Sequence, residues 1–294
     1  MEETTIISYQ RDHFVDTEEL SFPFLDDIGG TIRGYRVFTA CRTVNGKIFR
    51  LDDHIERIYR SAAGIRMQPP MLSDGLRSLL EDIVARNLEI APGTDLQVDV
   101  VFSGGLLGST MNQTGRGAHL YIAVVPLVEP EPEMYESGVA LATFPHQRMW
   151  AEVKLLNYVA AIVAYQTVAP PHNAYDVVYV DPIDRRTVLE GSTFTVFFAD
   201  SGGNIVTPPL DGHILDSVTR RVLLQIADSR ADINIRESRV SLDDIPSFRE
   251  AFIASTTRGV LPVVRIDDVV IGDGKPGPAT RAVMKVFRDY LTSY

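Results

Sequence analysis

Lys154 and Tyr158 are the residue pair whose types and spacing best suit covalent chemistry in this sequence. They stand in Ala151-Glu-Val-Lys-Leu-Leu-Asn-Tyr158, where an apolar, strand-like pattern gives way to a helical one. A lysine amine held at the end of an element can stay partly neutral near neutral pH, as Schiff-base formation requires. Tyr158, at i+4, shares the lysine's face of the predicted helix. If the lysine forms an imine with an aromatic aldehyde, the Tyr158 phenol can hydrogen-bond the ring oxygen ortho to that imine. By spacing alone, a solvated lysine is the commoner interpretation.

Composition excludes several other classes of protein. The chain has 294 residues, 45% hydrophobic and 23% charged, which is typical of a globular protein with one large or two modest domains. A net charge of −11 argues against a nucleic-acid partner. With no signal-peptide pattern and no apolar run of about 18 residues, we expect a soluble, cytoplasmic protein without a membrane span. Cys41 is the single cysteine, which excludes an internal disulfide, and its strand-like neighbours indicate a buried, inert thiol. The histidines lack ligand-like spacing, so no metal site is expected.

The elements that position these residues alternate in type along the chain. The proline- and glutamate-rich stretch 126–133 predicts a linker. We therefore predict a small N-terminal domain (1–126), a linker (127–134) and a large C-terminal domain (135–294). The Asn45-Gly46 pair predicts a tight hairpin. Periodicity predicts helices at 53–66, 73–87 (capped by Ser73-Asp74), 155–168, 217–227 and 279–291, and strands at 36–43, 47–51, 96–102, 120–125, 139–143, 176–180, 193–198, 251–255 and 260–266. The fold class is α/β (α+β), with mixed sheets in two domains.

Lys154-Leu-Leu-Asn-Tyr158 resembles the Lys-x-x-Asn-Tyr motif of class IV (fold-type IV) aminotransferases. Further segments match that family in its order, so that the resemblance extends from about Arg33 to Tyr290. They are Phe49-Arg-Leu-Asp-Asp-His-Ile-Glu-Arg-Ile-Tyr-Arg-Ser-Ala62, Val188-Leu-Glu-Gly-Ser-Thr193, Ile214-Leu-Asp-Ser-Val-Thr-Arg220 and Phe252-Ile-Ala-Ser-Thr-Thr-Arg-Gly-Val-Leu-Pro-Val263. The resemblance implies a small N-terminal α/β domain, a larger C-terminal mixed-sheet domain, pyridoxal 5′-phosphate as cofactor and a homodimer.

The resemblance also implies roles for particular residues. Lys154 carries the cofactor as a Schiff base and shuttles a proton, and Glu190, in a predicted turn, keeps the pyridine nitrogen protonated. Arg57 grips the phosphate with a fork of donors. The other cofactor-binding residues are Tyr158, the helix start Ser217, Val218 and Thr219, and the hydroxyls of Thr256 and Thr257. The implied reaction is ping-pong transamination between an amino acid and a 2-oxo acid.

The residues that would bind the substrate carboxylate differ from those of the best-known members of the family. The strand 96–102 lacks the arginine that branched-chain enzymes carry there, and the arginine and two histidines of the familiar D-amino acid enzymes are also absent. This strand and the Gly-Gly after it, together with Arg33-Gly-Tyr, Phe144-x-x-Gln-Arg148 and Ile-Gly-Asp-Gly-Lys-Pro-Gly277, most resemble a divergent group of D-amino acid transaminases. The carboxylate-binding candidates are Arg33 and then Arg116. Asp99, if it faces the site, favours an amine without a carboxylate. The alternatives are a branched-chain L-amino acid or (R)-amine transaminase, aminodeoxychorismate lyase, and a non-enzymatic binding protein on the same scaffold.

Overall fold

A computed structural model describes residues 5–105 and 117–294 of the chain. Contacts between Cα atoms divide it into two compact units. The first contains Met1–Val128, Val153–Asn157 and Tyr294, and the second contains Glu129–Glu152 and Tyr158–Ser293. The short segment Val153–Asn157, which carries Lys154, thus belongs to the first unit although it lies inside the predicted domain 135–294. No helix of the described residues is long and apolar enough to cross a membrane.

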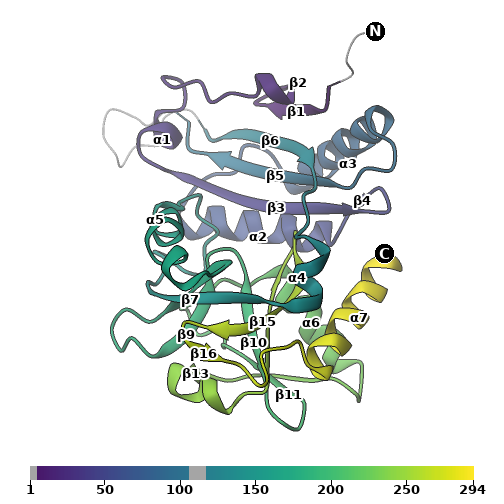
Figure 1. The fold of residues 1–294 in the computed structure, drawn as a ribbon. Helices are drawn as coiled ribbons and strands as arrows, with labels where there is room; N and C mark the ends of the chain where they lie inside the picture. The colour runs from purple at the N-terminus through teal and green to yellow at the C-terminus, as the bar shows by residue number, and fades with distance from the viewer. Residues whose placement is uncertain (1–4, 106–116) are drawn as a thin grey trace. The chain divides into compact units, whose positions relative to one another are not determined.

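The first unit is built on a six-stranded antiparallel sheet with the order β2-β1-β6-β5-β3-β4 (Figure 1). Asn45 and Gly46 both have positive φ angles, 51° and 78°, as the predicted tight hairpin between β3 and β4 requires. The second strand of that hairpin is shorter than predicted because a helix begins at Leu51. The strands are β1 (Ile7–Gln10), β2 (His13–Asp16), β3 (Arg36–Val44), β4 (Lys47–Ile48), β5 (Leu96–Ser103) and β6 (His119–Pro126).

Two amphipathic helices cover one face of this sheet (Figure 1). They are α2 (Leu51–Gly64) and α3 (Ser73–Ile90), and the short elements η1 (Thr17–Glu19) and α1 (Ile28–Thr31) complete the unit. Ile58 of α2 and Leu76 of α3 pack against Val98 of the sheet in one fully buried core. The predicted Ser73 cap is wrong: Leu72 holds the N-cap position, and no side chain caps the helix.

The second unit contains a ten-stranded mixed sheet. Its order is β12-β11-β10-β14-β15-β7-β8-β9-β13, with β16 paired to β15. The β11–β12, β7–β15 and β7–β8 pairs are parallel and the others antiparallel. The strands are β7 (Val139–Pro145), β8 (Asp176–Val180), β9 (Thr187–Gly191), β10 (Thr195–Ala199), β11 (Asn204–Thr207), β12 (Asn234–Glu237), β13 (Val240–Ser241), β14 (Glu250–Ser255), β15 (Gly259–Ile266) and β16 (Val269–Val270); the helices are α4 (Pro132–Ser137), α5 (Val159–Thr167), η2 (Pro170–His172), α6 (Val218–Asp228), η3 (Leu242–Ser247) and α7 (Pro278–Thr292).

Several of these elements differ from the sequence-based expectation, since β9, β11, β12, β13, β16, η2 and η3 fall outside every predicted range. The helix α4 begins inside the predicted linker, because Pro132 occupies its first turn, where a missing N–H costs no hydrogen bond. The helix α5 begins at Val159 instead of residue 155. The strand β9 was not predicted, and it contains Glu190, which therefore lies on a strand and not in a turn.

Candidate active site

The main chain around Lys154 pairs with the edge of β3. Phe38 N donates to the Lys154 carbonyl (3.0 Å), and Leu156 N donates to the Arg36 carbonyl (3.2 Å). This edge is open because β4 pairs only with the last two residues of β3. Edge strands present unpaired backbone N–H and C=O groups. The extended segment around Lys154 pairs with these groups of β3, and the pairing fixes its position. The lysine is thus held by sheet pairing in the first unit.

This pairing overturns the predicted helix over residues 155–158. Lys154 and Tyr158 do not share a helix face, because Tyr158 is the N-cap residue of α5, with φ −116° and ψ 14°. Lys154 N instead donates to Ser61 Oγ of α2 (3.1 Å). The lysine side chain runs over Phe38, with Nζ 4.8 Å from the ring centroid. A cation above an aromatic face is favoured electrostatically, which gives the amine a defined position.

Arg57 lies on the buried face of α2, with 4% of its surface exposed. Its Nη2 donates to Thr39 Oγ1 (2.7 Å) and lies 3.3 Å from His54 Nδ1. Thr39 Oγ1 is also hydrogen-bonded to His54 Nδ1 (2.8 Å). A buried guanidinium whose orientation is fixed by a hydroxyl and an imidazole is suited to receiving an anion on its other donors.

In the second unit, the predicted site residue Glu190 has both carboxylate oxygens hydrogen-bonded. Its Oε1 accepts from Arg148 Nε (2.8 Å) and Nη2 (2.6 Å), and its Oε2 accepts from Leu215 N (3.2 Å). Arg148 Nη2 also donates to the Ala151 carbonyl (2.9 Å). Only 6% of Glu190 is exposed, so these donors compensate for its burial. Arg148 was not predicted as a site residue, because nothing local in the sequence shows that it donates two hydrogen bonds to Glu190.

The start of α6 offers a place for an anion. Ser217 is its N-cap, and Ser217 Oγ accepts from Arg220 N (3.4 Å). Thr219, two residues further, is fully buried, and its Oγ1 has no hydrogen-bond partner within the described residues. An unsatisfied buried hydroxyl beside the free N–H groups of an eleven-residue helix fits a phosphate. The residues present therefore fit the phosphorylated cofactor that the sequence implies.

Thr256 and Thr257 form the turn between β14 and β15 together with Arg258, which is the centre of a partly buried polar network. Its Nη1 donates to Thr193 Oγ1 (2.6 Å), its Nη2 to Asp176 Oδ2 (3.3 Å) and its Nε to Tyr175 Oη (3.0 Å). The network thereby links the turn of the two threonines to the segment that follows Glu190. Sequence analysis did not identify Arg258 or Asp176, because their pairing spans 82 residues.

The predicted substrate-binding residues belong to the first unit. Arg33 is exposed just after α1, and its side chain makes no hydrogen bond or ion pair within the described residues. Arg116 lies outside the described residues. Asp99 is half-buried on β5, and burial raises the pKa of its carboxyl, opposed by a hydrogen bond from Gln97 and by the charge of Lys154. In the β3–β5 register Asp99 shares a face of the sheet with Phe38, over whose ring the Lys154 amine lies, which the sequence left open.

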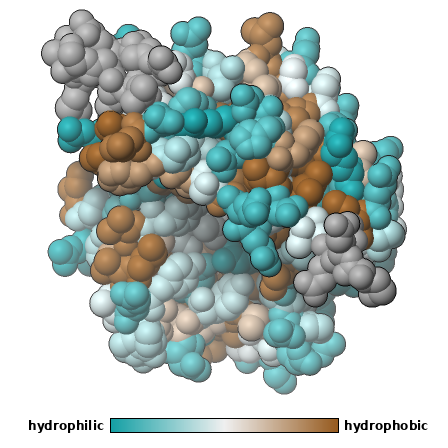
Figure 2. All heavy atoms as spheres, turned by 90° about the horizontal axis from the view of Figure 1, so that it is seen from above, coloured by the Kyte–Doolittle hydropathy of each residue, from teal (hydrophilic) through white to brown (hydrophobic). Residues whose placement is uncertain are grey.

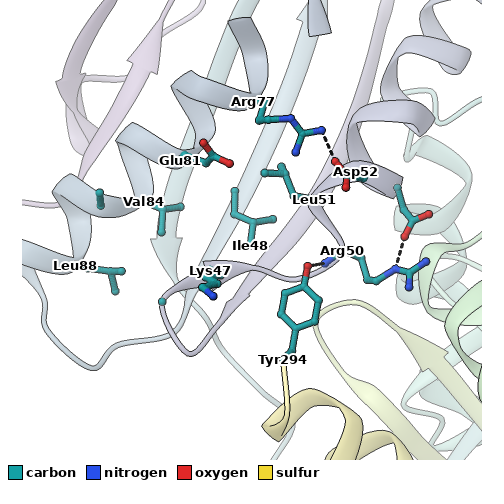
Figure 3. A pocket seen from close by; sticks show the side chains of 13 residues that line it. Lys47, Ile48, Arg50, Leu51, Asp52, Arg77, Glu81, Val84, Leu88 and Tyr294 are labelled. Atoms are coloured by element: carbon teal, nitrogen blue, oxygen red, sulfur yellow. Dashed lines mark hydrogen bonds and ion pairs between the residues drawn. The ribbon is translucent and has the colours of Figure 1, made fainter. Parts of the chain in front are cut away.

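A separate cavity of about 750 Å³ contains none of the predicted site residues. Two ion pairs, Arg50 with Asp53 and Arg77 with Asp52, engage four of its charged side chains (Figure 3). Its polar groups thus largely satisfy one another, and we do not assign it to the reaction. The lining residues are Gly46, Lys47, Ile48, Arg50, Leu51, Asp52, Asp53, Arg77, Glu81, Val84, Ala85, Leu88 and Tyr294.

Comparison with known proteins defines the family. The family described as Amino-transferase class IV matches residues 36–266. A D-alanine aminotransferase of Bacillus licheniformis is 31% identical over 284 residues, covering 95% of this chain and 92% of the relative. A putative branched-chain-amino-acid aminotransferase of Methanocaldococcus jannaschii is 27% identical, covering 97% and 96%.

Solved structures share the fold. The branched-chain amino acid aminotransferase of T.th. with pyridoxamine 5′-phosphate superposes with a TM-score of 0.86 at 24% identity, covering 98% of this chain and 95% of that one. The Escherichia coli branched-chain enzyme superposes with a TM-score of 0.84 at 20% identity, covering 98% and 95%. The two-sheet architecture is that of the fold-type IV aminotransferases. The chain belongs to the class IV aminotransferase family, and it is an aminotransferase.

Proposed function

We propose that the protein carries pyridoxal 5′-phosphate on Lys154 and moves an amino group between an amino acid and a 2-oxo acid. The observation that carries this assignment is the buried Glu190 carboxylate, held in one orientation by Arg148 and the N–H of Leu215. The cofactor, when bound, supplies an electron sink whose strength depends on a carboxylate at the pyridine nitrogen. In this proposal Glu190 is that carboxylate, and the Lys154 amine moves the substrate proton.

Two features of the chain support the assignment of phosphate-binding residues. Arg57 is the charged donor, because its guanidinium is already oriented by Thr39 and His54. The buried Thr219 hydroxyl supports the assignment of the α6 N-terminus. The remaining residues that we assign to the cofactor are Ser217, Val218, Thr256, Thr257 and, through its phenol, Tyr158.

A D-amino acid is the favoured amino donor. The relatives of highest identity among those described are named D-alanine aminotransferases, and β5 carries no arginine for an L-substrate carboxylate. Arg33, whose side chain no described residue contacts by a hydrogen bond or ion pair, is our first candidate for the carboxylate, and Arg116 is the second. A branched-chain L-amino acid is the second candidate substrate, favoured by the name of the Methanocaldococcus jannaschii relative.

The functional test compares half-reactions of the cofactor-loaded protein. D-alanine or D-glutamate should discharge the visible absorbance of the bound cofactor faster than L-leucine or L-valine. The variant Lys154→Ala should lose both the borohydride-reducible link and turnover, by several orders of magnitude, because nucleophile and proton carrier disappear together. The exposed Lys275→Ala is the matched control. Wild-type turnover in Lys154→Ala would refute the mechanism, whereas faster reaction of aliphatic L-amino acids would replace only the substrate.

The carboxylate anchor is tested separately. Arg33→Ala should raise the KM for amino acids far more than for (R)-1-phenylethylamine, because that amine has no carboxylate to lose. Equal effects on the two substrate classes would remove Arg33 from the proposal and leave the reaction intact.

A further inference from the structure

Alternation along β5 places Asp99 on the face of the first unit's sheet opposite α2 and α3. Val98 and Val100 point into the core under α2 and α3. Successive side chains of a strand point to opposite faces, so Asp99 points away from those helices. In the β3–β5 register, Ala40 pairs with Asp99 and Phe38 with Val101. Asp99 is therefore a diagonal neighbour of Phe38 on the same face.

Phe38 also marks the position of the reacting amine. Lys154 Nζ lies 4.8 Å from the centre of the Phe38 ring. Phe38 and Val101 are both buried, with 8% and 7% of their surface exposed, and they form an apolar wall beside the amine. The β3–β5 register places the acidic Asp99 next to this wall. The positive charge of Lys154 favours the ionised form of the Asp99 carboxyl.

The Asp99 carboxylate is only partly satisfied. Gln97 Nε2 donates to Oδ2 (2.7 Å), and no other described residue donates a hydrogen bond to Asp99. No arginine of the described residues forms an ion pair with it. A half-buried carboxylate of this kind loses solvation that one amide donor does not replace. A cationic substrate group beside Asp99 compensates for the lost solvation, whereas an anionic substrate group is repelled by the Asp99 carboxylate.

We propose that Asp99 is a specificity-determining residue that favours amino donors whose second functional group is cationic or neutral and disfavours those whose second group is a carboxylate. The inference rests on the proposed transaminase function and names the class of substrate that this site prefers. It concerns the charge of the substrate's side chain and is independent of the substrate's handedness. Among D-amino acids it ranks D-ornithine above D-glutamate.

The test uses Asp99→Asn, which keeps the shape and the Gln97 contact but removes the charge. Half-reaction rates are compared within two pairs of similar size, D-glutamate with D-glutamine and D-ornithine with D-norvaline. In the variant the glutamate-to-glutamine ratio of kcat/KM should rise about tenfold, and the ornithine-to-norvaline ratio should fall about tenfold, because a single charge interaction has been removed. The control Asp82→Asn, a charge loss at a half-exposed site on α3, should leave both ratios unchanged.

A binding measurement separates charge recognition from catalysis. Calorimetry on the protein loaded with pyridoxamine 5′-phosphate, in which amines do not react, compares glutarate, 5-aminopentanoate and pentanoate. Asp99→Asn should tighten glutarate and weaken 5-aminopentanoate, with pentanoate unchanged. If Asp99→Asn still transaminates but leaves the rate ratios and affinities unchanged, the role of Asp99 is refuted and the proposed transaminase function stands. Absence of any half-reaction in the wild-type protein would instead overturn the proposed function.

Discussion

At the scale of single residues, Arg57 is the buried cation whose removal most directly tests cofactor binding. Arg57→Ala deletes a guanidinium fork that Thr39 and His54 orient. We expect weaker affinity for pyridoxal phosphate, by about 2–4 kcal/mol, with the ring chemistry intact. Titration of the apoprotein with cofactor measures the affinity, and excess cofactor should restore much of the rate. Activity that saturating cofactor fails to restore would assign Arg57 another role; the exposed Arg60→Ala on the same helix is the control.

Cys41 is buried in the core of the first unit, and burial raises the pKa of its thiol from 9.0 to about 12. The thiol is therefore neutral in the folded protein near pH 8, and only a thiolate attacks a disulfide reagent. We expect labelling by dithiobisnitrobenzoate at pH 8 to be slow in buffer and fast in denaturant. Because the folded pKa lies above the unfolded value, the neutral thiol contributes stability that is present below about pH 9 and lost as pH rises towards 12. Rapid labelling of the folded protein would show that Cys41 is accessible.

At the scale of elements, Asp27 joins α1 to the end of β5. Its Oδ2 accepts from Ser103 Oγ (2.6 Å) and Arg36 Nη2 (3.0 Å), and its Oδ1 accepts from Gly105 N (2.9 Å). Gly30 has no room for a side chain here, since a Cβ would lie 1.9 Å from Ser103 Oγ. The contact fixes the segment that leads to Arg33.

Asp27→Asn should destabilise the protein by about 3 kcal/mol, because it leaves the largely buried Arg36 without its charged partner. Urea unfolding measures the change. The neighbouring Asp26→Asn alters an exposed pair with Arg11, so it should change stability by less than about 1 kcal/mol. Equal effects of the two substitutions would mean that the Asp27 contact adds little to stability.

The elements also show how far sequence reasoning reaches. Segments with a clear local pattern were predicted closely, as with β8 (Asp176–Val180) and α6, which begins one residue after the predicted start. The start of α5 was wrong because Lys154–Leu156 pairs with β3, more than a hundred residues away, and local periodicity carries no trace of that pairing. Arg148 was missed as a partner of Glu190 for the same reason. The orientation of Asp99 followed only once the strand register was known.

At the scale of the whole molecule, apolar side chains remain exposed. On the face shown in Figure 2 they form separate patches divided by hydrophilic side chains. In the second unit, α5 is apolar on nearly all sides, and Val159, Ile162 and Val163 are 68%, 53% and 45% exposed. A helix that is apolar all round is normally buried. We therefore propose that α5 packs against a second copy of the chain in a homodimer.

The dimer is tested by placing a charge on α5. Ile162→Glu should raise the dimer dissociation constant at least a hundredfold, about 3 kcal/mol, because a carboxylate would be desolvated in an apolar contact. Sedimentation velocity over a range of concentrations measures the constant. Gln166→Glu adds the same charge to an exposed polar position of the same helix and should leave the dimer intact. A wild-type protein that sediments as a monomer at micromolar concentration would refute the homodimer. If the dimer is equally stable in both variants, the contact lies elsewhere than α5. A glutamate buried without a partner in an apolar contact would raise the dimer dissociation constant.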